Sequence, residues 1–597
     1  MKIALIGAGP RNIALLDRLR IHNPEAEITV FDPDGWGGRV WRPTQSPLLL
    51  MNTPAGLITV FSDPTVTLVG ARTDGPTLAE WCRTTARDYL TTQTHLDVQQ
   101  RGVLTVAATR TREHDYAPRA LFGCYLQWAA AHIQARTTQP IQLVHAAVTA
   151  VHPTTNGYLL TTADGRTFGT ETAPFAKCVL TLGHLPQQPT ADMRATQQHA
   201  DSFGGTYIAP ALPDTVNTTS RRVIIRGLGL SFFDIVTTLT AGRGGTYTRG
   251  RNGLLQYHAS GREPEIIAGS RSGLPYRAKG RDEKMPGQVY QPHFLTPERL
   301  ADWQQSGKLP TVTELGKYLR LEFNCVYCMR QVPANEQAAF SSAFAENPQA
   351  ALAQWPTVQL PDWEAITQAP DFKSENRYTG SLLARLDADV RAAMGGNCTD
   401  PLASALEALR DMRVPLRQLL MGNDALYLGF RDQLAGRLNM LTVGPPLQRI
   451  DELQALIRAG VVRLLPPGMA VDDLPDGFCA TATSDPTYFA RAATLIDARL
   501  PAINADQTAS PLAQQLLRDG LAVKHLRTDR TDKGVLSGAL AVDADTSQLK
   551  RSDGTTQDGL YLWGVPTEGQ FWLTTASPHP FMNDINLRTA DKIAQLL

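Results

Sequence analysis

The stretch that decides the fold is KIALIGAGPRN, residues 2–12. Its first five residues form an apolar run that predicts a short buried strand, and a glycine turn and a helical pattern follow. Gly7 permits the tight turn, and Gly9 lets a pyrophosphate approach the backbone at a helix N-terminus. Asn12 stands where a third glycine is usual. The segment therefore predicts a dinucleotide-binding turn that includes Gly7, Gly9, Pro10 and Asn12.

A second predicted strand, Glu27 to Phe31, ends in Asp32. A carboxylate at this distance from the glycine turn suits a hydrogen bond from a ribose 2′-hydroxyl. The plainer alternative is a tight turn followed by a surface aspartate. Strand, glycines, helix and acid occur in register, and this favours the nucleotide site.

A second glycine turn lies in the middle of the chain. The apolar run Arg222 to Arg226 precedes Gly227 and Gly229, and Ser231 opens a helical pattern. Phe232 stands in place of the third glycine. This variant is seen in pyridine-nucleotide sites of flavoproteins.

The strand predicted after this second turn, Glu265 to Gly269, ends in Ser270-Arg271-Ser272 and has no acid at its end. An arginine flanked by hydroxyls can pair with a 2′-phosphate, which a carboxylate would repel. We therefore expect NADPH rather than NADH, with Arg277, Lys279 and Arg281 adding to the positive field. The alternative is a solvated basic loop.

Several further motifs resemble a known group of flavoproteins. They are GGRVW at 37–41, LLMNTP at 49–54, FSDP at 61–64, PRALFG at 118–123, LGHLP at 182–186, GPP at 444–446 and GVP at 564–566. With the two glycine turns, they resemble flavin-containing, Baeyer-Villiger and N-hydroxylating monooxygenases. The resemblance is closest to a bacterial branch of FAD/NAD(P)-binding proteins that includes nitrosuccinate synthase.

The resemblance implies FAD on the first turn and suggests which residues surround it. Asn52 would lie beside the flavin, where an amide can donate and accept hydrogen bonds without adding charge. Gln45 would face the isoalloxazine. Alternatively, Asn52 caps a loop and Trp41 is a buried core residue. His184 is expected to be structural. The other residues predicted at the cofactor are Gly38, Trp41, Met51, Val148, Gly183 and Gly564.

One departure from the family pattern concerns the last predicted strand. Related flavoproteins place an aspartate after the glycine that ends it, whereas Val565 and Pro566 follow Gly564 here. The corresponding bond to the cofactor must therefore come from the backbone or from elsewhere.

The predicted function follows from the two turns and the resemblance together. NADPH would reduce FAD, and the reduced flavin would react with dioxygen to give a C4a-peroxide that oxygenates a small nucleophile such as an amine. The protein supplies the orientation. Two alternatives stay open: a flavin reductase or dehydrogenase without oxygen insertion, and a non-catalytic sensor of FAD or NADPH.

The predicted fold class is α/β, with two Rossmann-like domains and a large helical insertion. We expect residues 1–205 to form the first part of the FAD-binding domain. The NADPH-binding domain is expected to span 215–290, and a helical lid or substrate domain to span 296–440. Residues 441–597 would return to the FAD-binding domain. Strands at 492–497 and 560–563 are expected to rejoin its sheet, and a helix at 583–597 to close it.

Composition excludes several partners. Lys+Arg and Asp+Glu each total 57 in 597 residues, so nucleic acid and anionic membranes are not expected. Seven scattered cysteines fit a reducing cytoplasm. Cys325 and Cys328 are expected to be buried helix thiols rather than ligands, because a metal site would lack further ligands nearby. We expect a cytoplasmic enzyme with a small-molecule substrate and no metal; the sequence leaves homo-oligomers and the substrate open.

Overall fold

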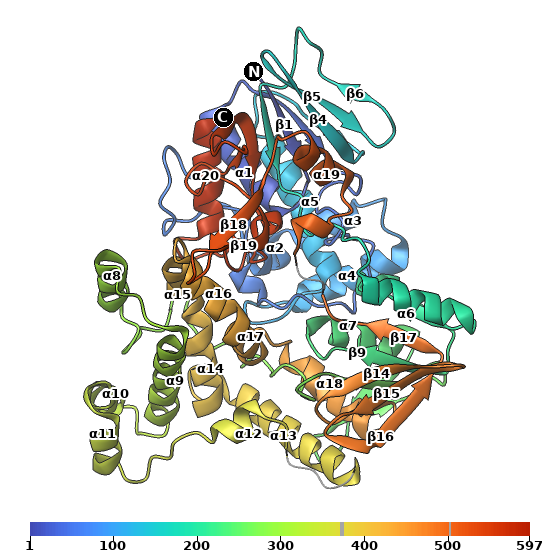
Figure 1. The fold of residues 1–597 in the computed structure, drawn as a ribbon, viewed down its shortest axis with the longest axis vertical. Coiled ribbons are helices and arrows are strands. Elements are labelled where there is room, and N and C mark those ends of the chain that lie inside the picture. Colours follow the sequence, from blue (N-terminus) through green and yellow to red (C-terminus); the bar gives the residue numbers. More distant parts are fainter. Residues whose placement is uncertain (371–374, 501–502) are drawn as a thin grey trace. The chain divides into compact units, whose positions relative to one another are not determined.

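A computed structural model describes residues 1–370, 375–500 and 503–597. The chain folds as two compact units (Figure 1). The first comprises residues 1–188 and 502–597, and the second comprises residues 189–501. Both contain parallel sheets with helices, which confirms the predicted α/β class. The four functional domains defined from the sequence remain a prediction.

The first unit is built on a sheet of strand order β20-β21-β7-β1-β2-β3. Strand β1 lies between β2 and β7 and is parallel to both, with Ile3 opposite Ile28 and Lys177. Its helices and strands are β1 (Lys2–Ile6), α1 (Pro10–His22), β2 (Glu27–Phe31), η1 (Ala55–Leu57), α2 (Leu78–Thr84), α3 (Ala86–Thr91), α4 (Val98–Arg110), α5 (Arg119–Gln134), β3 (Ile141–Val144), β4 (Val148–Thr154), β5 (Gly157–Thr162), β6 (Thr167–Phe168), β7 (Lys177–Leu180), η4 (Ala505–Gln507), α19 (Pro511–Arg518), β18 (Lys524–Thr528), β19 (Gly534–Leu540), β20 (Gln548–Lys550), β21 (Thr556–Leu562), η5 (Val565–Thr567) and α20 (Ile585–Leu596).

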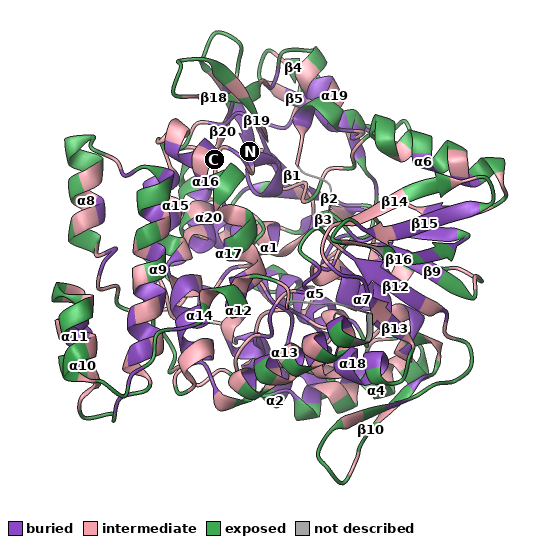
Figure 2. Ribbon diagram, turned by 60° about the horizontal axis from the view of Figure 1, so that its bottom comes forward, coloured by how far each residue is buried: buried purple, intermediate pink, exposed green. Residues whose placement is uncertain are grey.

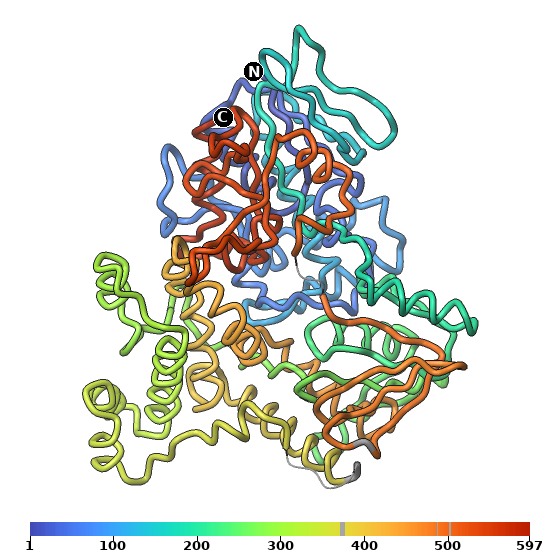
Figure 3. The backbone as a smooth tube through the Cα atoms, in the orientation of Figure 1, coloured from blue at the N-terminus to red at the C-terminus, as the bar shows by residue number. Residues whose placement is uncertain are grey.

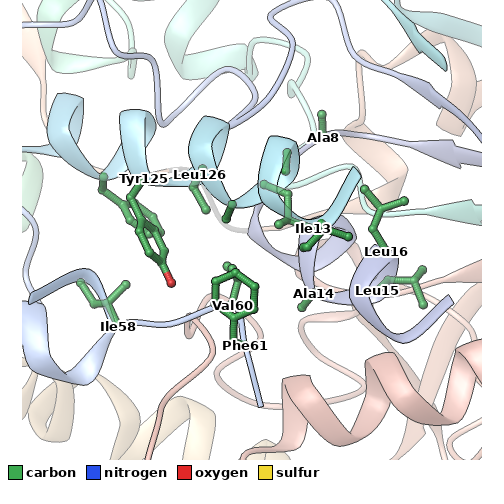
Figure 4. Close-up of a cluster of buried hydrophobic side chains, with 14 of the residues drawn as sticks. Ala8, Ile13, Ala14, Leu15, Leu16, Ile58, Val60, Phe61, Tyr125 and Leu126 are labelled. Carbon is green, nitrogen blue, oxygen red and sulfur yellow. The ribbon is translucent and has the colours of Figure 1, made fainter. Parts of the chain in front are cut away.

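Both ends of the chain contribute to this unit. The last helix, α20, packs on α1, as the blue and red tubes of Figure 3 show. Arg18 Nε donates to Asp591 Oδ1 at 2.8 Å, and the two side chains form a buried ion pair. The apolar face of α1, including Ile13 and Leu16, contributes to one buried cluster with α5 (Figure 4). The predicted return of β21 and a closing helix is confirmed.

The second unit contains a parallel sheet of strand order β13-β12-β9-β17-β8. Strands β9 and β12 are largely buried (Figure 2). The elements of this unit are α6 (Ala191–Ser202), β8 (Thr206–Ile208), η2 (Pro213–Thr215), β9 (Arg222–Arg226), α7 (Leu230–Leu239), η3 (Ala241–Arg243), β10 (Thr246–Arg249), β11 (Leu255–His258), β12 (Glu265–Gly269), α8 (Pro297–Ser306), α9 (Val312–Met329), α10 (Gln337–Glu346), α11 (Pro348–Gln354), α12 (Trp363–Thr367), α13 (Glu375–Gly395), α14 (Pro401–Asp411), α15 (Arg413–Leu420), α16 (Asp424–Gln433), α17 (Ala435–Thr442), α18 (Leu447–Arg458), β13 (Val462–Leu464), β14 (Met469–Leu474), β15 (Gly477–Ala482), β16 (Asp485–Ala492) and β17 (Thr494–Asp497).

One strand was predicted in the wrong sheet. We expected residues 492–497 to rejoin the first sheet, but β17 pairs in parallel with β9 and β8 of the second. Strand β13 likewise extends the second sheet beside β12. An apolar run predicts a strand but not its neighbours, since parallel pairing joins segments far apart in sequence.

The large helical region expected from the sequence is present as the helices α8 to α17, whereas its role as a lid or substrate domain remains a prediction. Local signals set its helix ends. Thr311 and Glu314 form a capping box at the start of α9. Helices α10 and α11 are separate, because Asn347 caps a new helix that begins at Pro348.

Among the described residues, no helix is both long and apolar enough to cross a membrane.

Candidate cofactor and active site

The turn after β1, called the first cradle, comprises Gly7, Ala8 and Gly9 with Asp32. Gly7 has φ +104°, and a Cβ there would lie 2.6 Å from the backbone oxygen of Thr181. Only glycine fits this close approach. Gly9 caps α1, and no described atom lies within 4 Å of the place that its Cβ would take. The backbone at Gly9 is therefore open to a ligand.

Asp32 closes the first cradle from the end of β2. Its Oδ2 accepts a hydrogen bond from the Ala8 N–H at 2.8 Å, and its Oδ1 accepts one from the Asp34 N–H at 2.9 Å. Burial raises the pKa of the Asp32 carboxyl, while these two N–H groups act to lower it. Each carboxylate oxygen has a second lone pair, so a ribose hydroxyl can still donate to it.

Two polar atoms beside the first cradle fit a bound dinucleotide. Asn12 Nδ2 donates to the Gly7 carbonyl and so ties down the turn that a third glycine would leave unsupported. Asn12 Oδ1 and Thr181 Oγ1 are buried and have no hydrogen-bond partner among the described residues. Because buried polar atoms are normally satisfied, the first cradle fits a cofactor with hydroxyl and phosphate groups, such as FAD.

Two of the motifs singled out in the sequence, at 49–54 and 118–123, contact each other in the first unit. The Met51 N–H donates to Ala117 O, and the Arg119 N–H donates to Leu49 O, each at 2.8 Å. The segment 49–51 is thereby fixed to the start of α5. Asn52 is half-buried directly after it. A side chain on a loop held at such a rigid support can be positioned accurately.

Gly38, Trp41 and Gln45 belong to the loop that follows β2. A Cβ on Gly38 would lie 3.2 Å from Asp32 Oδ2, so this glycine lies at the first cradle. Trp41 packs edge-on against Phe122, with ring centroids 5.1 Å apart. Gln45 is buried, and its Nε2 donates to Val40 O and Arg42 O at 3.0 Å each. The Nε2 group of Gln45 therefore stabilises the loop. The contact of Gln45 with a flavin remains a prediction.

The remaining residues predicted at FAD lie in three places. Val148 begins β4, in a separate sheet with β5 and β6. Gly183 has φ +64°, in the turn after β7, and the His184 side chain is exposed. Gly564 has φ +110°, and its Cβ would lie 3.2 Å from the Arg11 side chain. The fold thus brings Gly564 next to α1, although Gly564 and Arg11 lie near opposite ends of the sequence.

The second cradle comprises Gly227, Leu228 and Gly229 with Arg271. Gly227 has φ +116°, and its N–H donates to Gly269 O at 2.8 Å. Gly229 caps α7, and Ser231 is half-buried in its first turn. The Tyr276 ring lies over this turn, with Cζ 3.6 Å from the place that a Gly229 Cβ would take. The backbone at Gly229 is therefore covered where that at Gly9 is open.

Arg271 lies at the carboxyl end of β12, which pairs in parallel with β9, the strand that leads into the second cradle. Its side chain is exposed, and Ser270 Oγ lies 3.3 Å from Ser272 Oγ. Two of the other predicted cations are already paired: Arg277 with Asp389 and Arg281 with Glu283, each at 3.0 Å. The positive field expected from Arg277 and Arg281 is therefore largely neutralised, because each faces a carboxylate.

Cys325 and Cys328 are buried on α9, as the sequence predicted. Burial raises the pKa of each thiol to about 12. Such thiols are protonated at neutral pH and are poor nucleophiles.

Thr181 and Tyr276 were missed by the sequence analysis. Thr181 directly follows β7, next to β1, so the order of parallel strands would have placed it at the first cradle. Tyr276 follows a loop whose path the sequence does not determine, and no local pattern marks it.

Comparison with known proteins gives consistent results. A sequence profile described as FAD-NAD(P)-binding matches residues 4–185. An L-aspartate N-monooxygenase (nitrosuccinate-forming) of Streptomyces cremeus is 34% identical over 100% of this chain and 94% of its own length. A nitrosuccinic acid synthase of Aspergillus oryzae is 31% identical over 99% of this chain and 92% of its own.

Among solved structures, an ornithine N-hydroxylase of Kutzneria sp. 744 aligns with a TM-score of 0.38 and 13% identity, covering 99% of this chain and 97% of its own. The assignment depends on the full-length sequence relatives alone. They confirm the predicted class, an FAD- and NAD(P)H-dependent oxidoreductase of the monooxygenase type. This chain belongs to the family of nitrosuccinate-forming L-aspartate N-monooxygenases.

Proposed function

We propose that this chain oxidises the amine nitrogen of L-aspartate to give nitrosuccinate, using NADPH and dioxygen. The observation that carries the proposal is the full-length similarity to enzymes with that activity, at 34% and 33% identity. Two separate glycine cradles support it, since such an enzyme needs one site for FAD and one for NADPH.

Each cradle has a proposed role. Bound FAD would supply the two-electron chemistry and the activation of dioxygen. The backbone at Gly7 and Gly9 would hold its pyrophosphate, and Asp32 would accept a ribose hydroxyl. In the second cradle, Arg271 would pair with the 2′-phosphate of NADPH.

Asn52 is the proposed active-site amide beside the flavin. It would orient the reacting groups by donating and accepting hydrogen bonds without adding charge. The first oxygenation would convert an amine, dioxygen, NADPH and one proton into a hydroxylamine, water and NADP⁺. Two further oxygenations of the same nitrogen, each consuming one dioxygen, one NADPH and one proton and releasing water and NADP⁺, would give first a nitroso and then the nitro group.

The test is product analysis with the FAD-loaded protein. L-Aspartate, NADPH and isotopically labelled dioxygen should give nitrosuccinate that carries the label, detected by mass spectrometry. Asn52→Ala should lower the nitrosuccinate formed per NADPH consumed. NADPH consumption without any labelled product would favour the reductase alternative, and no consumption with any acceptor would favour the sensor.

A further inference from the structure

The chain that leaves β17 runs beside the second cradle. Strand β17 pairs in parallel with β9, and the Ala498 N–H continues this pairing by donating to Arg226 O at 3.0 Å. Arg499 is the next residue. A Cβ on Gly227 would lie 3.0 Å from Arg499 Cγ and 3.3 Å from the Arg499 backbone nitrogen. The side chain of Arg499 therefore lies against the first glycine of the second cradle.

The order of the strands in this sheet marks the same place as a ligand site. The chain passes from β9 to β12 on one side of β9, whereas β17 lies on the other side (Figure 1). In open α/β sheets, ligands bind outside the carboxyl ends of the strands at the point where the strand order reverses. Arg226 ends β9 and Asp497 ends β17. These two residues and Arg499 therefore lie at the edge where a ligand is expected.

A buried carboxylate orients the guanidinium of Arg499. Asp497 Oδ1 accepts hydrogen bonds from the backbone N–H of Arg499 at 3.1 Å and from its Nε at 2.9 Å. Asp497 Oδ2 accepts from Arg499 Nη2 at 2.7 Å and from Arg226 Nη2 at 2.8 Å. Burial acts to raise the pKa of Asp497, but the two arginines outweigh it and hold the pKa below its ordinary value. Asp497 is therefore a carboxylate at neutral pH.

The oriented guanidinium still has hydrogen-bond donors for a ligand. Arg499 Nη1 has no acceptor among the described residues, and 53% of the side chain is exposed. Two arginines share the buried Asp497, and the other carboxylate nearby, Asp192, is exposed and lies 3.6 Å from Arg226. A guanidinium has N–H donors on more than one edge, so Arg499 can face Asp497 with one edge and a phosphate with another.

The first cradle has a neutral residue at the matching position. There the Thr181 N–H donates to Ile6 O at 2.8 Å, as the Ala498 N–H donates to the last carbonyl of β9. The residue that follows Thr181 is Leu182, whereas the residue that follows Ala498 is Arg499. A cation is therefore not needed to form such a turn, and this favours a role of Arg499 toward a ligand.

We propose that Arg499 binds the pyrophosphate of NADPH, on the side of the second cradle opposite Arg271. The inference rests on the proposed function, which assigns NADPH to this cradle. Arg271 follows β12 and Arg499 follows β17, and these strands lie on opposite sides of β9. A pyrophosphate at the N-terminus of α7 would lie between the two arginines, where the helix N–H groups and Arg499 both favour its negative charge.

Three ligands separate the two arginines. NADP⁺ has both a pyrophosphate and a 2′-phosphate, NAD⁺ has only the pyrophosphate, and adenosine 2′-monophosphate has only the 2′-phosphate. In calorimetric titrations of the FAD-loaded protein, Arg499→Gln should weaken the binding of NADP⁺ and NAD⁺ about 10-fold each and leave that of adenosine 2′-monophosphate unchanged. Arg271→Gln should instead weaken the binding of NADP⁺ and adenosine 2′-monophosphate and leave that of NAD⁺ unchanged.

Arg222→Gln is the matched control for Arg499→Gln. Arg222 begins β9, at the opposite edge of the same sheet. Its side chain is 51% exposed and pairs with Glu265 at 2.7 Å, so it resembles Arg499 in exposure and in having a carboxylate partner. Arg222→Gln should bind all three ligands with unchanged affinity. Retained binding of adenosine 2′-monophosphate in Arg499→Gln would show that this variant is folded.

Three results would overturn the proposal. Unchanged affinity for NADP⁺ and NAD⁺ in Arg499→Gln would show that Arg499 does not contact the coenzyme. Weaker binding of NADP⁺ and adenosine 2′-monophosphate, with unchanged binding of NAD⁺, would place Arg499 at the 2′-phosphate. An equal loss of affinity for all three ligands would show that Arg499 supports the fold and not the pyrophosphate.

The outcomes for this inference and for the proposed function are distinct. A protein in which Arg499→Gln gives the predicted pattern, but which forms no nitrosuccinate, keeps the pyrophosphate contact and loses the proposed reaction. A protein that forms nitrosuccinate, with unchanged NADP⁺ affinity in Arg499→Gln, keeps the reaction and loses the contact.

Discussion

The two glycine cradles have the same turn but different surroundings. Both begin with a glycine at positive φ, Gly7 at +104° and Gly227 at +116°. The first is open above Gly9 and is closed at one side by a buried carboxylate, Asp32. The second is covered by Tyr276 and is followed by an exposed cation, Arg271.

We propose that the charge at the end of the neighbouring strand, and not the shared backbone motif, determines which dinucleotide binds. A carboxylate can accept a hydrogen bond from a ribose hydroxyl, and an arginine can pair with a phosphate.

The largest effect is expected from Gly7→Ala. A Cβ would lie 2.6 Å from a backbone oxygen, in a backbone conformation that disfavours any side chain. The protein should lose its FAD, measured as the ratio of flavin absorbance to protein. Gly102→Ala is the matched control, because no described atom lies within 4 Å of its Cβ position. Full flavin content in Gly7→Ala would show that FAD does not use this cradle.

Gly227→Ala should affect the other dinucleotide. Its Cβ would lie 3.0 Å from the Arg499 side chain, which is flexible, so the strain comes mainly from φ +116°. We expect NADP⁺ to bind about 10-fold or more weakly, because that strain costs on the order of 1–3 kcal/mol. FAD content should stay normal. Loss of FAD with retained NADP⁺ affinity would show that FAD binds at the second cradle and not at the first.

Arg271→Gln should discriminate between the coenzymes. The affinity for NADPH should fall about 10- to 100-fold with the loss of a charge-assisted contact, while that for NADH should change little. The KM values for NADPH and NADH measure this. Arg251→Gln, another exposed arginine of the same unit, is the control. An equal loss of affinity for both coenzymes would show that Arg271 does not contact the 2′-phosphate.

Tyr276→Ala should have the smallest effect. It removes a ring that covers Gly229, and one aromatic contact is worth about 1 kcal/mol, or about 5-fold in affinity. The dissociation rate of NADP⁺, measured by stopped flow, should rise by about that factor in Tyr276→Ala, because the contact is lost. Tyr276→Phe keeps the ring and should resemble the wild type. No change in Tyr276→Ala would mean that the ring leaves the site whenever the nucleotide binds.

The parts of this fold that depend on local sequence could be predicted. The two units of strand, glycine turn and helix were predicted correctly, and so was the position of Arg271 at the end of β12, because each depends on a short stretch of sequence. The neighbours of β17 depend on long-range pairing and were not predictable. Nor was the neutralisation of Arg277, since its partner Asp389 is 112 residues away. The cover over Gly229 depends in the same way on a loop path that no periodicity encodes.

The central claim is that the chain holds two different dinucleotides and passes electrons from one to the other. Anaerobic mixing of the FAD-loaded protein with NADPH tests it most directly. We expect rapid bleaching of the bound flavin in the wild type. In Gly227→Ala, the protein should stay yellow, and bleaching should be slow or require excess NADPH. Bleaching at the wild-type rate in Gly227→Ala, or no bleaching in the wild type, would contradict it.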